Sequence, residues 1–206
     1  SGGAADGDAS SPGPTPLGEA AVANAARACR ALLVAGADPE APSGVARAEF
    51  SLRPLALAAG AGAGDALLVL LWARALIDPS VDQASMALHE AVGRGHVACA
   101  HALLEARAAV DANCPLHGTA LHVACRRSRA DVAELLLTWQ ADPNALNDGG
   151  QTPLGLAFQA SQRSREARAS FRPLRERLLA AGAELGEFNP TLYGASGGGA
   201  RAGEPG

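Results

Sequence analysis

The sequence predicts an all-α solenoid of about five stacked helix-turn-helix units joined by short hairpin-like loops. A six-residue pattern, typified by Thr152-Pro153-Leu154-Gly155-Leu156-Ala157, occurs five times. The last four copies are evenly spaced, the first gap is longer, and a double leucine follows each of the first four copies at one constant offset. A constant period is typical of arrays whose units bury their apolar faces only against neighbouring units. The five central leucines are Leu17, Leu55, Leu88, Leu121 and Leu154, and the double leucines begin at Leu32, Leu70, Leu103 and Leu136.

The Thr-Pro pair that opens the first and fifth copies of the pattern is typical of a helix start. The threonine hydroxyl can cap free backbone amides, and the proline that follows fixes φ for the first turn. One turn into the helix, in the fourth unit, we expect His122 to hydrogen-bond back to the hairpin that precedes it. Small residues such as Ala124 and Cys125 then allow the two antiparallel helices of the unit to approach closely.

The second half of each unit has the residues of a buried helix followed by a turn. Leu135, Leu136 and Leu137 place the second helix in the core, and a Gly or Gln closes its C-terminus. The turn residues Asp142-Pro143-Asn144 and Asn147-Asp148-Gly149-Gly150 follow. They predict a hairpin that projects toward the next unit.

Three departures from the regular unit are visible. We attribute the longer first spacing to a linker over residues 39–51. Gly60, Gly62 and Gly64 cost roughly 1 kcal/mol each if they fall inside a helix, so we expect the second unit to be the softest internal joint. The last unit carries an internal insertion, and we interpret its polar segment over 159–172 as a solvated helix extension, with a functional loop as the alternative.

The array is expected to occupy most of the chain. Residues 1–13 have too little apolar surface to fold, and residues 186–206 form a Gly-rich tail, so both are predicted to be disordered. The five units are expected at about 14–42, 52–80, 85–113, 118–147 and 151–185.

Composition excludes several classes of protein. The 206 residues carry a net charge of −4, which argues against nucleic acid and anionic membranes as partners. The longest dense apolar stretch, Ala66 to Ala73, is far shorter than the ~20 residues of a membrane span. All 17 basic residues are Arg, a bias that a GC-rich genome explains and that a selected loss of ubiquitin acceptors would also produce. Four cysteines without a secretory signal indicate reduced thiols and a cytoplasmic or nuclear location.

No motif of catalysis or metal binding occurs in the sequence context that it requires. The Gly60-Ala61-Gly62-Ala63-Gly64 segment lacks the Lys of a phosphate-binding loop, and H-E-x-x-H does not occur. The one G-x-S-x-G string, at 194–198, lies in the Gly-rich tail, where no strand-turn-helix nucleophile elbow is expected. Cys114, His117, His122 and Cys125 are the right residue types for zinc, but the repeat already uses His122 and Cys125 as framework positions. We therefore expect no enzyme activity, no metal and no cofactor.

The repeated pattern resembles the ankyrin repeat, whose period is about 33 residues and whose hallmark is T-P-L-H-x-A. The resemblance extends over residues 14–185, and Met86–Ala91 and Thr119–Ala124 are the most faithful copies. It implies a non-catalytic module that binds a protein partner with its hairpin tips and the concave face of its first helices. The positions that it assigns to partner binding are Asp82, Gln83, Arg94, Leu116, Arg126, Arg127, Trp139, Gln151 and Gln159.

Two of these candidate features have specific chemistry. Arg94, Arg126, Arg127 and Arg129 would form a positive strip suited to an acidic segment of the partner, unless they form only a solvated face. Trp139, expected beside two arginines, is either a binding hot spot or a packing residue against the next unit.

A narrower resemblance extends over two units. Residues 87–99 and 117–125 look like the ankyrin repeat and SOCS-box proteins. That family implies a substrate-recognition subunit of a cullin-RING ubiquitin ligase, docked on elongin through a C-terminal box. Residues 186–206 contain Pro190 and several glycines, which disfavour a docking helix, so we expect this chain not to recruit elongin. Separately, we expect the chain to be monomeric by itself.

Overall fold

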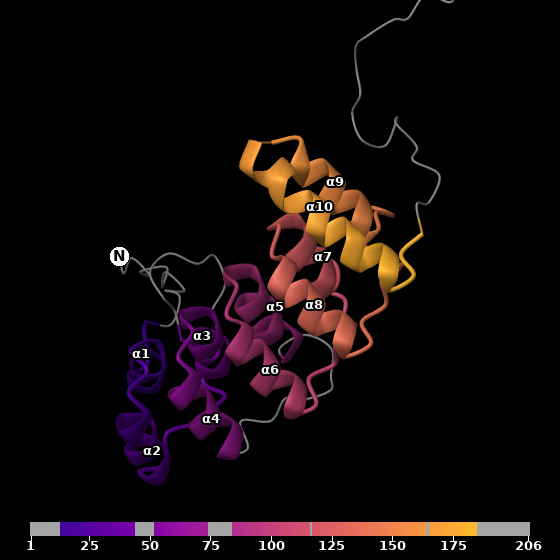
Figure 1. The fold of residues 1–206 in the computed structure, drawn as a ribbon. Coiled ribbons are helices and arrows are strands. Elements are labelled where there is room, and N and C mark those ends of the chain that lie inside the picture. Colours follow the sequence, from indigo (N-terminus) through magenta and orange to yellow (C-terminus); the bar gives the residue numbers. More distant parts are fainter. Residues whose placement is uncertain (1–12, 44–51, 74–83, 116, 164, 185–206) are drawn as a thin grey trace, which may run out of the picture.

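The computed structural model describes residues 13–43, 52–73, 84–115, 117–163 and 165–184, and these residues form ten helices and no β-strand (Figure 1). The segments predicted to be disordered lie outside the described residues, apart from Gly13, and so do the candidates Asp82, Gln83 and Leu116. None of the helices in the described ranges is both long and apolar enough to cross a membrane. The helices are α1 (Pro16–Val22), α2 (Ala26–Val34), α3 (Pro54–Ala61), α4 (Gly64–Trp72), α5 (Ala84–Arg94), α6 (Val97–Glu105), α7 (Ala120–Arg126), α8 (Ala130–Thr138), α9 (Pro153–Ser161) and α10 (Arg165–Ala180).

The ten helices form five antiparallel pairs that stack in one row. The first helices α1, α3, α5, α7 and α9 contact one another in sequence and form one layer. The second helices α2, α4, α6, α8 and α10 form the other layer, and each packs on its own first helix. Figure 1 shows the row running from α1 at one end to α10 at the other. The predicted all-α solenoid of five units is confirmed.

The core consists of leucine and alanine at repeated positions. The central leucine of every unit is buried, and Leu70, Leu103, Leu136 and Leu178 are buried at the double-leucine position of units two to five. The residue three places after each central leucine is a buried alanine, in all five units. Because a methyl group occupies little space, the first helices can approach closely, and a core with few aromatic residues becomes possible.

Helix starts follow the predicted chemistry. The Gly18 backbone N–H donates to Thr15 Oγ1 at 3.1 Å, and the Gly155 N–H donates to Thr152 Oγ1 at 3.2 Å. The proline after each threonine begins the helix. In the second unit Arg53 takes the place of the threonine, and the start of α3 has no side-chain cap.

The turn between the two helices of a unit adopts the left-handed conformation at the same position in four units. The residues with positive φ are Asn24 (52°), Gly62 (71°), Gly95 (82°) and Ser128 (55°). Gly62 therefore lies in a turn where glycine is favoured, and Gly64 is only the first residue of α4. The cost of a glycine inside a helix applies to Gly60 alone, which removes most of the basis for expecting a soft second unit.

The glycines of the second unit also make room for the third. The His96 ring covers Gly62 so closely that a Cβ there would lie 2.7 Å from His96 Nδ1. His96 Nε2 lies 3.0 Å from the Gly60 carbonyl oxygen, within hydrogen-bonding distance. These positions are therefore contacts between units.

The framework histidines connect the third and fourth units to the hairpins that follow them. The Thr119 backbone N–H donates to His122 Nδ1 at 3.1 Å, so the ring proton is on Nε2. His122 Nε2 then donates to the Gln151 carbonyl oxygen at 2.9 Å, and His89 Nε2 lies 2.8 Å from the Gly118 carbonyl oxygen in the same way. The prediction that His122 bonds to the preceding hairpin is wrong, because the ring bonds to the cap residue of its own helix and to the hairpin that follows.

A serine replaces the framework histidine at the first joint. The Thr15 N–H donates to Ser43 Oγ at 2.8 Å, and Ser43 is fully buried. The first unit has Gly18 at the histidine position, where a Cβ would lie only 2.4 Å from Ser43 Oγ. The hydroxyl group from the following hairpin thus occupies the space that the ring fills in the third and fourth units.

The additional residues that separate the first two central leucines lie between Ser43 and Leu52. Three described hairpins are closed by backbone hydrogen bonds, in which the N–H of Ser43 donates to Leu52 O, that of Cys114 to Gly118 O and that of Asn147 to Gln151 O; in the second hairpin the Gly118 N–H also donates to Cys114 O. The loop is short between the partners of the last two hairpins, whereas residues 44–51 separate them in the first. The expected linker over 39–51 is thus narrowed to this loop.

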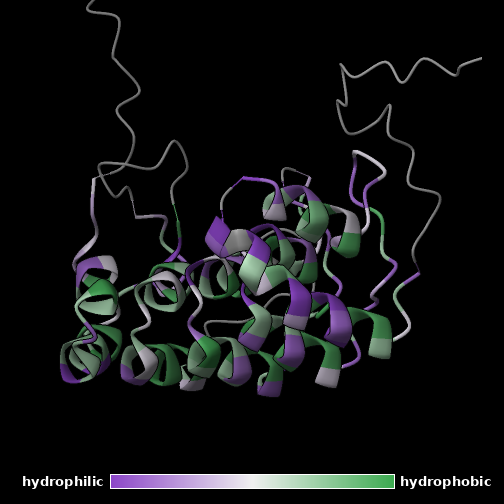
Figure 2. Ribbon diagram, turned by 45° about the horizontal axis from the view of Figure 1, so that its top comes forward, coloured by the Kyte–Doolittle hydropathy of each residue, from purple (hydrophilic) through white to green (hydrophobic). Residues whose placement is uncertain are grey.

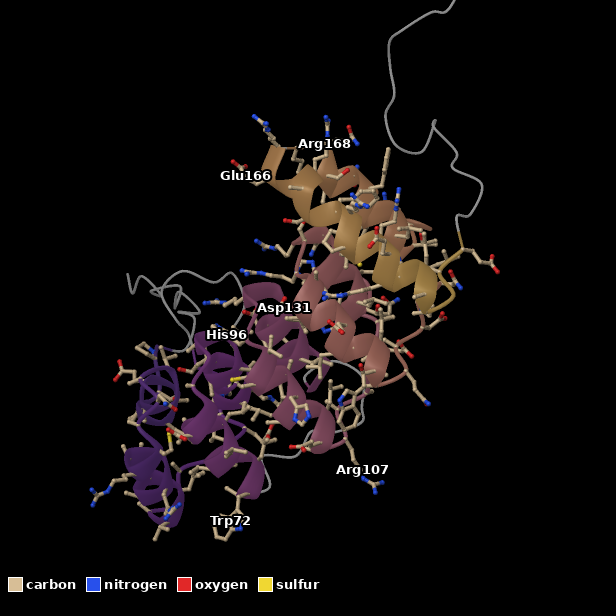
Figure 3. All side chains as sticks on the ribbon, viewed as in Figure 1. Trp72, His96, Arg107, Asp131, Glu166 and Arg168 are labelled. Atoms are coloured by element: carbon tan, nitrogen blue, oxygen red, sulfur yellow. The ribbon has the colours of Figure 1, made fainter. Side chains whose placement is uncertain are left out.

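The insertion in the last unit lengthens its second helix. α10 has 16 residues, whereas α2, α4, α6 and α8 have nine each. Arg165, Glu166 and Arg168 in the added part are exposed, and Figure 3 shows Glu166 and Arg168 at the outer end of the array. Figure 2 shows mainly hydrophilic colour on the helix that comes to the front, α10. The prediction of a solvated helix extension is confirmed.

We predict that Leu136→Ala destabilises the chain strongly. Leu136 is fully buried, and a leucine-to-alanine change at such a site costs about 2–5 kcal/mol through lost burial and a residual cavity. Urea unfolding followed by circular dichroism measures the loss. Leu146→Ala is the matched control, because Leu146 is 60% exposed and its truncation should change stability by less than about 0.5 kcal/mol. Equal losses in the two variants would contradict the assigned register.

We predict that the stability of the chain falls as pH decreases from 7 to 5, in part through His122. Burial, together with repulsion by His89 and Arg126, lowers the pKa of His122 and outweighs its hydrogen bonds to backbone. Below about pH 6.5, the ordinary pKa of histidine, the unfolded chain binds a proton that the folded chain excludes, so stability is lost as the pH falls.

The variant His122→Gln should be less stable than the wild type at pH 7 and should lose less stability between pH 7 and 5. Urea unfolding at both pH values measures the difference. The control Leu146→Gln, which changes a non-titrating and exposed side chain, should keep the pH dependence of the wild type. An unchanged pH dependence in His122→Gln would contradict the assignment.

Candidate partner-binding surface

The ends of the first helices present a surface that repeats in geometry and varies in chemistry. Because the left-handed turn recurs at one position of the repeat, the residues around it lie at equivalent places in successive units. In the third and fourth units these places are occupied by arginines. The residues around these turns differ from unit to unit, so a partner could be recognised there.

Five arginines gather at this surface, and we call them the arginine strip. Arg94 is the last residue of α5, Arg126 is the last residue of α7, and Arg127 follows it as the C-cap. Arg129 precedes α8, and Arg163 follows α9. The strip thus extends over three successive units.

The charges at the centre of the strip are close enough to affect one another. Arg126 is half-buried, whereas Arg127 and Arg163 are exposed. Burial lowers the pKa of Arg126, and repulsion by Arg127 and Arg163 lowers it further, with the nearby Cys114 acting in the opposite direction. Three guanidinium groups from two units therefore share one region.

Arg129 connects this region to the third unit. Its guanidinium group lies over the turn between α5 and α6, where a Cβ on Gly95 would lie 2.9 Å from Arg129 Cζ. Gly95 also has a φ of 82°, which favours glycine. Because Gly95 directly follows Arg94, the Arg129 side chain covers the turn that begins after Arg94.

Most of the strip has no counter-charge among the described residues. Arg94 Nε lies 3.3 Å from Glu90 Oε2, one turn earlier in α5. Within the described ranges, no carboxylate forms an ion pair with Arg126, Arg127, Arg129 or Arg163. Guanidinium groups bind carboxylates with paired, charge-assisted hydrogen bonds. The arrangement can therefore accept an acidic segment.

The backbone of the candidate Gln151 takes part in the hydrogen bonds that hold its hairpin. Its carbonyl oxygen accepts from His122, and its backbone N–H donates to Asn147 Oδ1 at 2.9 Å. Asn147 Oδ1 also accepts from the Gly149 N–H at 3.0 Å, so this hairpin is held by its own hydrogen bonds. Asn113 Nδ2 donates to Asp148 Oδ1 at 3.3 Å and joins two neighbouring hairpins.

Trp139 lies apart from the arginine strip. It follows the C-terminus of α8, is 37% exposed, and packs edge-to-face on His101 with ring centroids 6.0 Å apart. Arg129 lies at the other end of α8, about 14 Å away along a nine-residue helix. The structure therefore does not place Trp139 beside the arginines, and it gives this side chain a packing contact in place of the expected neighbours.

Gln159 occupies a position equivalent to that of a strip residue, and one member of the strip, Arg163, was not predicted. Gln159 is exposed on α9, at the position that Arg126 occupies in α7. Arg163 was not among the candidates, because the insertion in the last unit obscures its register. Arg163 could have been identified from its position two residues after the end of α9, the first helix of the fifth unit.

The cysteines and histidines do not form a metal site. Within the described residues, no three His, Cys, Asp or Glu side chains lie close enough to hold an ion. Both ring nitrogens of His122 are engaged in hydrogen bonds. Burial raises the pKa of the Cys125 thiol, and likewise those of Cys29 and Cys99, so these thiols stay protonated.

The comparisons with known proteins identify the repeats. A family model of three ankyrin repeats matches residues 55–147 and again residues 88–166, and the two matches together span more than half of the chain. The chain therefore belongs to the ankyrin-repeat family. Proteins of this family are generally protein–protein interaction modules and typically lack catalytic activity. No curated protein matches the sequence.

Proposed function

We propose that this chain is a non-catalytic interaction module that binds an acidic segment of a protein partner on the arginine strip. The observation that carries the proposal is a set of arginines, at the ends of α5, α7 and α9, most of which lack an acidic partner in the described part of the chain. Binding would relieve the repulsion between Arg126, Arg127 and Arg163, because carboxylates of the partner would neutralise these charges.

The rigid stack supports this use of the surface. The hydrogen bonds of His89 and His122 and the packing of Arg129 on Gly95 join successive units. A partner therefore meets positions that are fixed before it binds, which reduces the entropy lost on association. The hairpin tips and the neighbouring Gln159 extend the proposed surface, and Asp82, Gln83 and Leu116 remain proposed contacts outside the described residues.

We further propose that the chain is monomeric by itself and acts in the cytoplasm or the nucleus. Cys29, Cys99, Cys114 and Cys125 are all free thiols, as expected in a reducing compartment.

The alternative is a substrate-recognition subunit of a cullin-RING ubiquitin ligase. It rests on the resemblance of residues 87–99 and 117–125 to the ankyrin repeat and SOCS-box proteins. Because residues 186–206 disfavour an elongin-docking helix, capture of a partner without elongin by this chain fits both functions. A longer form of the protein that contains a docking box and co-purifies with elongin would favour the ubiquitin-ligase alternative.

We predict that the double variant Arg126→Glu/Arg127→Glu loses its partners while it keeps its fold. Because the new carboxylates would repel an acidic segment, affinity should fall by ten-fold or more, which is about 1.4 kcal/mol, and wild-type binding should weaken with salt. The measurement is affinity capture with the wild type and the variant, quantified by mass spectrometry, followed by Kd determination for the recovered partner.

The matched control is Arg165→Glu/Arg168→Glu, which makes the same change of charge on the exposed extension of α10. This control should retain the partners that the strip variant loses. Circular dichroism establishes that both variants are folded. If both double variants capture the same proteins with the same affinity as the wild type, the strip is not the binding surface.

A further inference from the structure

The second helices expose two positions of the repeat, one helical turn apart, in every unit. In the third to fifth units the first of these positions holds His101, Glu134 or Glu176. Each of these side chains contacts a charged partner, namely Glu105, Arg177 and Arg172 respectively. In the third to fifth units the outer surface of the second helices is therefore polar and exposed to solvent. The position pairs are Arg30 and Val34, Leu68 and Trp72, His101 and Glu105, Glu134 and Thr138, and Glu176 and Ala180.

The second unit breaks this rule. Its two exposed positions hold Leu68 and Trp72, which are 57% and 81% exposed. Val34, 85% exposed, is the residue of the unit before that corresponds to Trp72. Figure 3 shows Trp72 at the end of α4, pointing away from the rest of the array. We call Val34, Leu68 and Trp72 the apolar patch.

A groove joins two members of the patch, Val34 and Trp72, and Leu68 lies one helical turn before Trp72 on α4. It has a volume of about 190 Å³, lies between the C-terminal halves of α2 and α4, and is lined by Arg30, Leu33, Val34, Val69, Trp72 and Ala73. Its lining is apolar except for Arg30. Two large exposed apolar side chains that line one groove, with a third exposed on the same face of α4, mark a contact surface, because a single chain gains nothing by exposing them.

The charge at the edge of the groove indicates the kind of partner. Arg30 lines the groove, and Arg27 lies one turn before it on α2; both are exposed. No ion pair engages either of them in the described part of the chain. A second copy of the chain would bring two such arginine pairs to one interface, and α2 has no carboxylate to oppose them. A separate partner with acidic residues suits the surface better.

We propose that the apolar patch docks an amphipathic helix of another protein, with an apolar side chain in the groove and an acidic residue against Arg30. Leu68 and Trp72 are spaced as i and i+4, so they form one ridge along α4. A helix laid beside that ridge presents its own apolar residues at matching intervals. This surface belongs to the second helices and is separate from the arginine strip, so the inference does not depend on the function proposed above.

The test is a selection from a display library of random 16-residue peptides, performed with the wild type and with Leu68→Gln/Trp72→Gln. Both substituted side chains are mostly exposed, so the variant should fold, and circular dichroism and urea unfolding establish this. We expect the wild type to enrich peptides with apolar residues at i, i+3 or i+4 and i+7, together with Asp or Glu.

Selected peptides are then synthesised, and their Kd values are measured by fluorescence anisotropy. The patch variant should bind them at least ten-fold more weakly, and Arg30→Glu should also weaken binding. Exchange of the peptide's acidic residues for Arg should restore binding to Arg30→Glu. The control Leu146→Gln, which removes an equally exposed leucine from a hairpin, should bind as the wild type does.

Four results would overturn the proposal. The first three are that the wild type enriches no peptide, that the patch variant enriches the same peptides as the wild type, and that the enriched peptides lack acidic residues. The fourth is a dimer of the wild type in analytical ultracentrifugation that Trp72→Gln dissociates, since the occupant would then be a second copy. Trp72-dependent sedimentation with phosphatidylserine vesicles, in the absence of enriched peptides, would identify a membrane surface instead and would equally reject the helix.

Discussion

The contact between successive first helices is the constraint on which the structure depends. A unit of two short helices cannot bury its leucines by itself, so each unit needs the next one. Close approach requires the buried alanine that follows every central leucine by three residues. The same requirement restricts the core mainly to leucine and alanine. Side chains that can bind a partner therefore lie on the outer surface. A partner can therefore be recognised only by side chains that the stack does not use.

The joints between units turn this packing into a fixed geometry. His122 bonds to the next hairpin, Ser43 performs a related task at the first joint, and Arg129 and His96 cover the turns of the units before them. Because equivalent residues lie in equivalent places, the residue at any position of one unit can be compared directly with its counterparts in the other units. The arginine strip and the apolar patch both stand out in that comparison, one on the first helices and one on the second.

The period of the sequence was sufficient to predict the number of units, the helix starts at Thr15 and Thr152, and the helical nature of the insertion. These features depend on local spacing and on capping chemistry. The direction of the His122 bond could not be predicted, because the ring lies between two hairpins and only stacking decides which one it meets. Trp139 was expected near Arg126 and Arg127, yet α8 separates them, since residues close in sequence lie at opposite ends of an antiparallel pair. The groove beside Trp72 requires two units to be placed side by side, although the unusual Leu68 and Trp72 were visible in the register.

Hydrogen exchange of the native chain tests the central claim most directly, since it reports the stability of each helix separately. If stability comes from contacts between neighbouring units, the helices α3 to α8, whose units have neighbours on both sides, should exchange more slowly than the helices of the two end units. Protection should decrease toward α1 and α2 at one end and toward α9 and α10 at the other. Equal protection of all ten helices, or slower exchange at the ends than in the middle, would contradict the account.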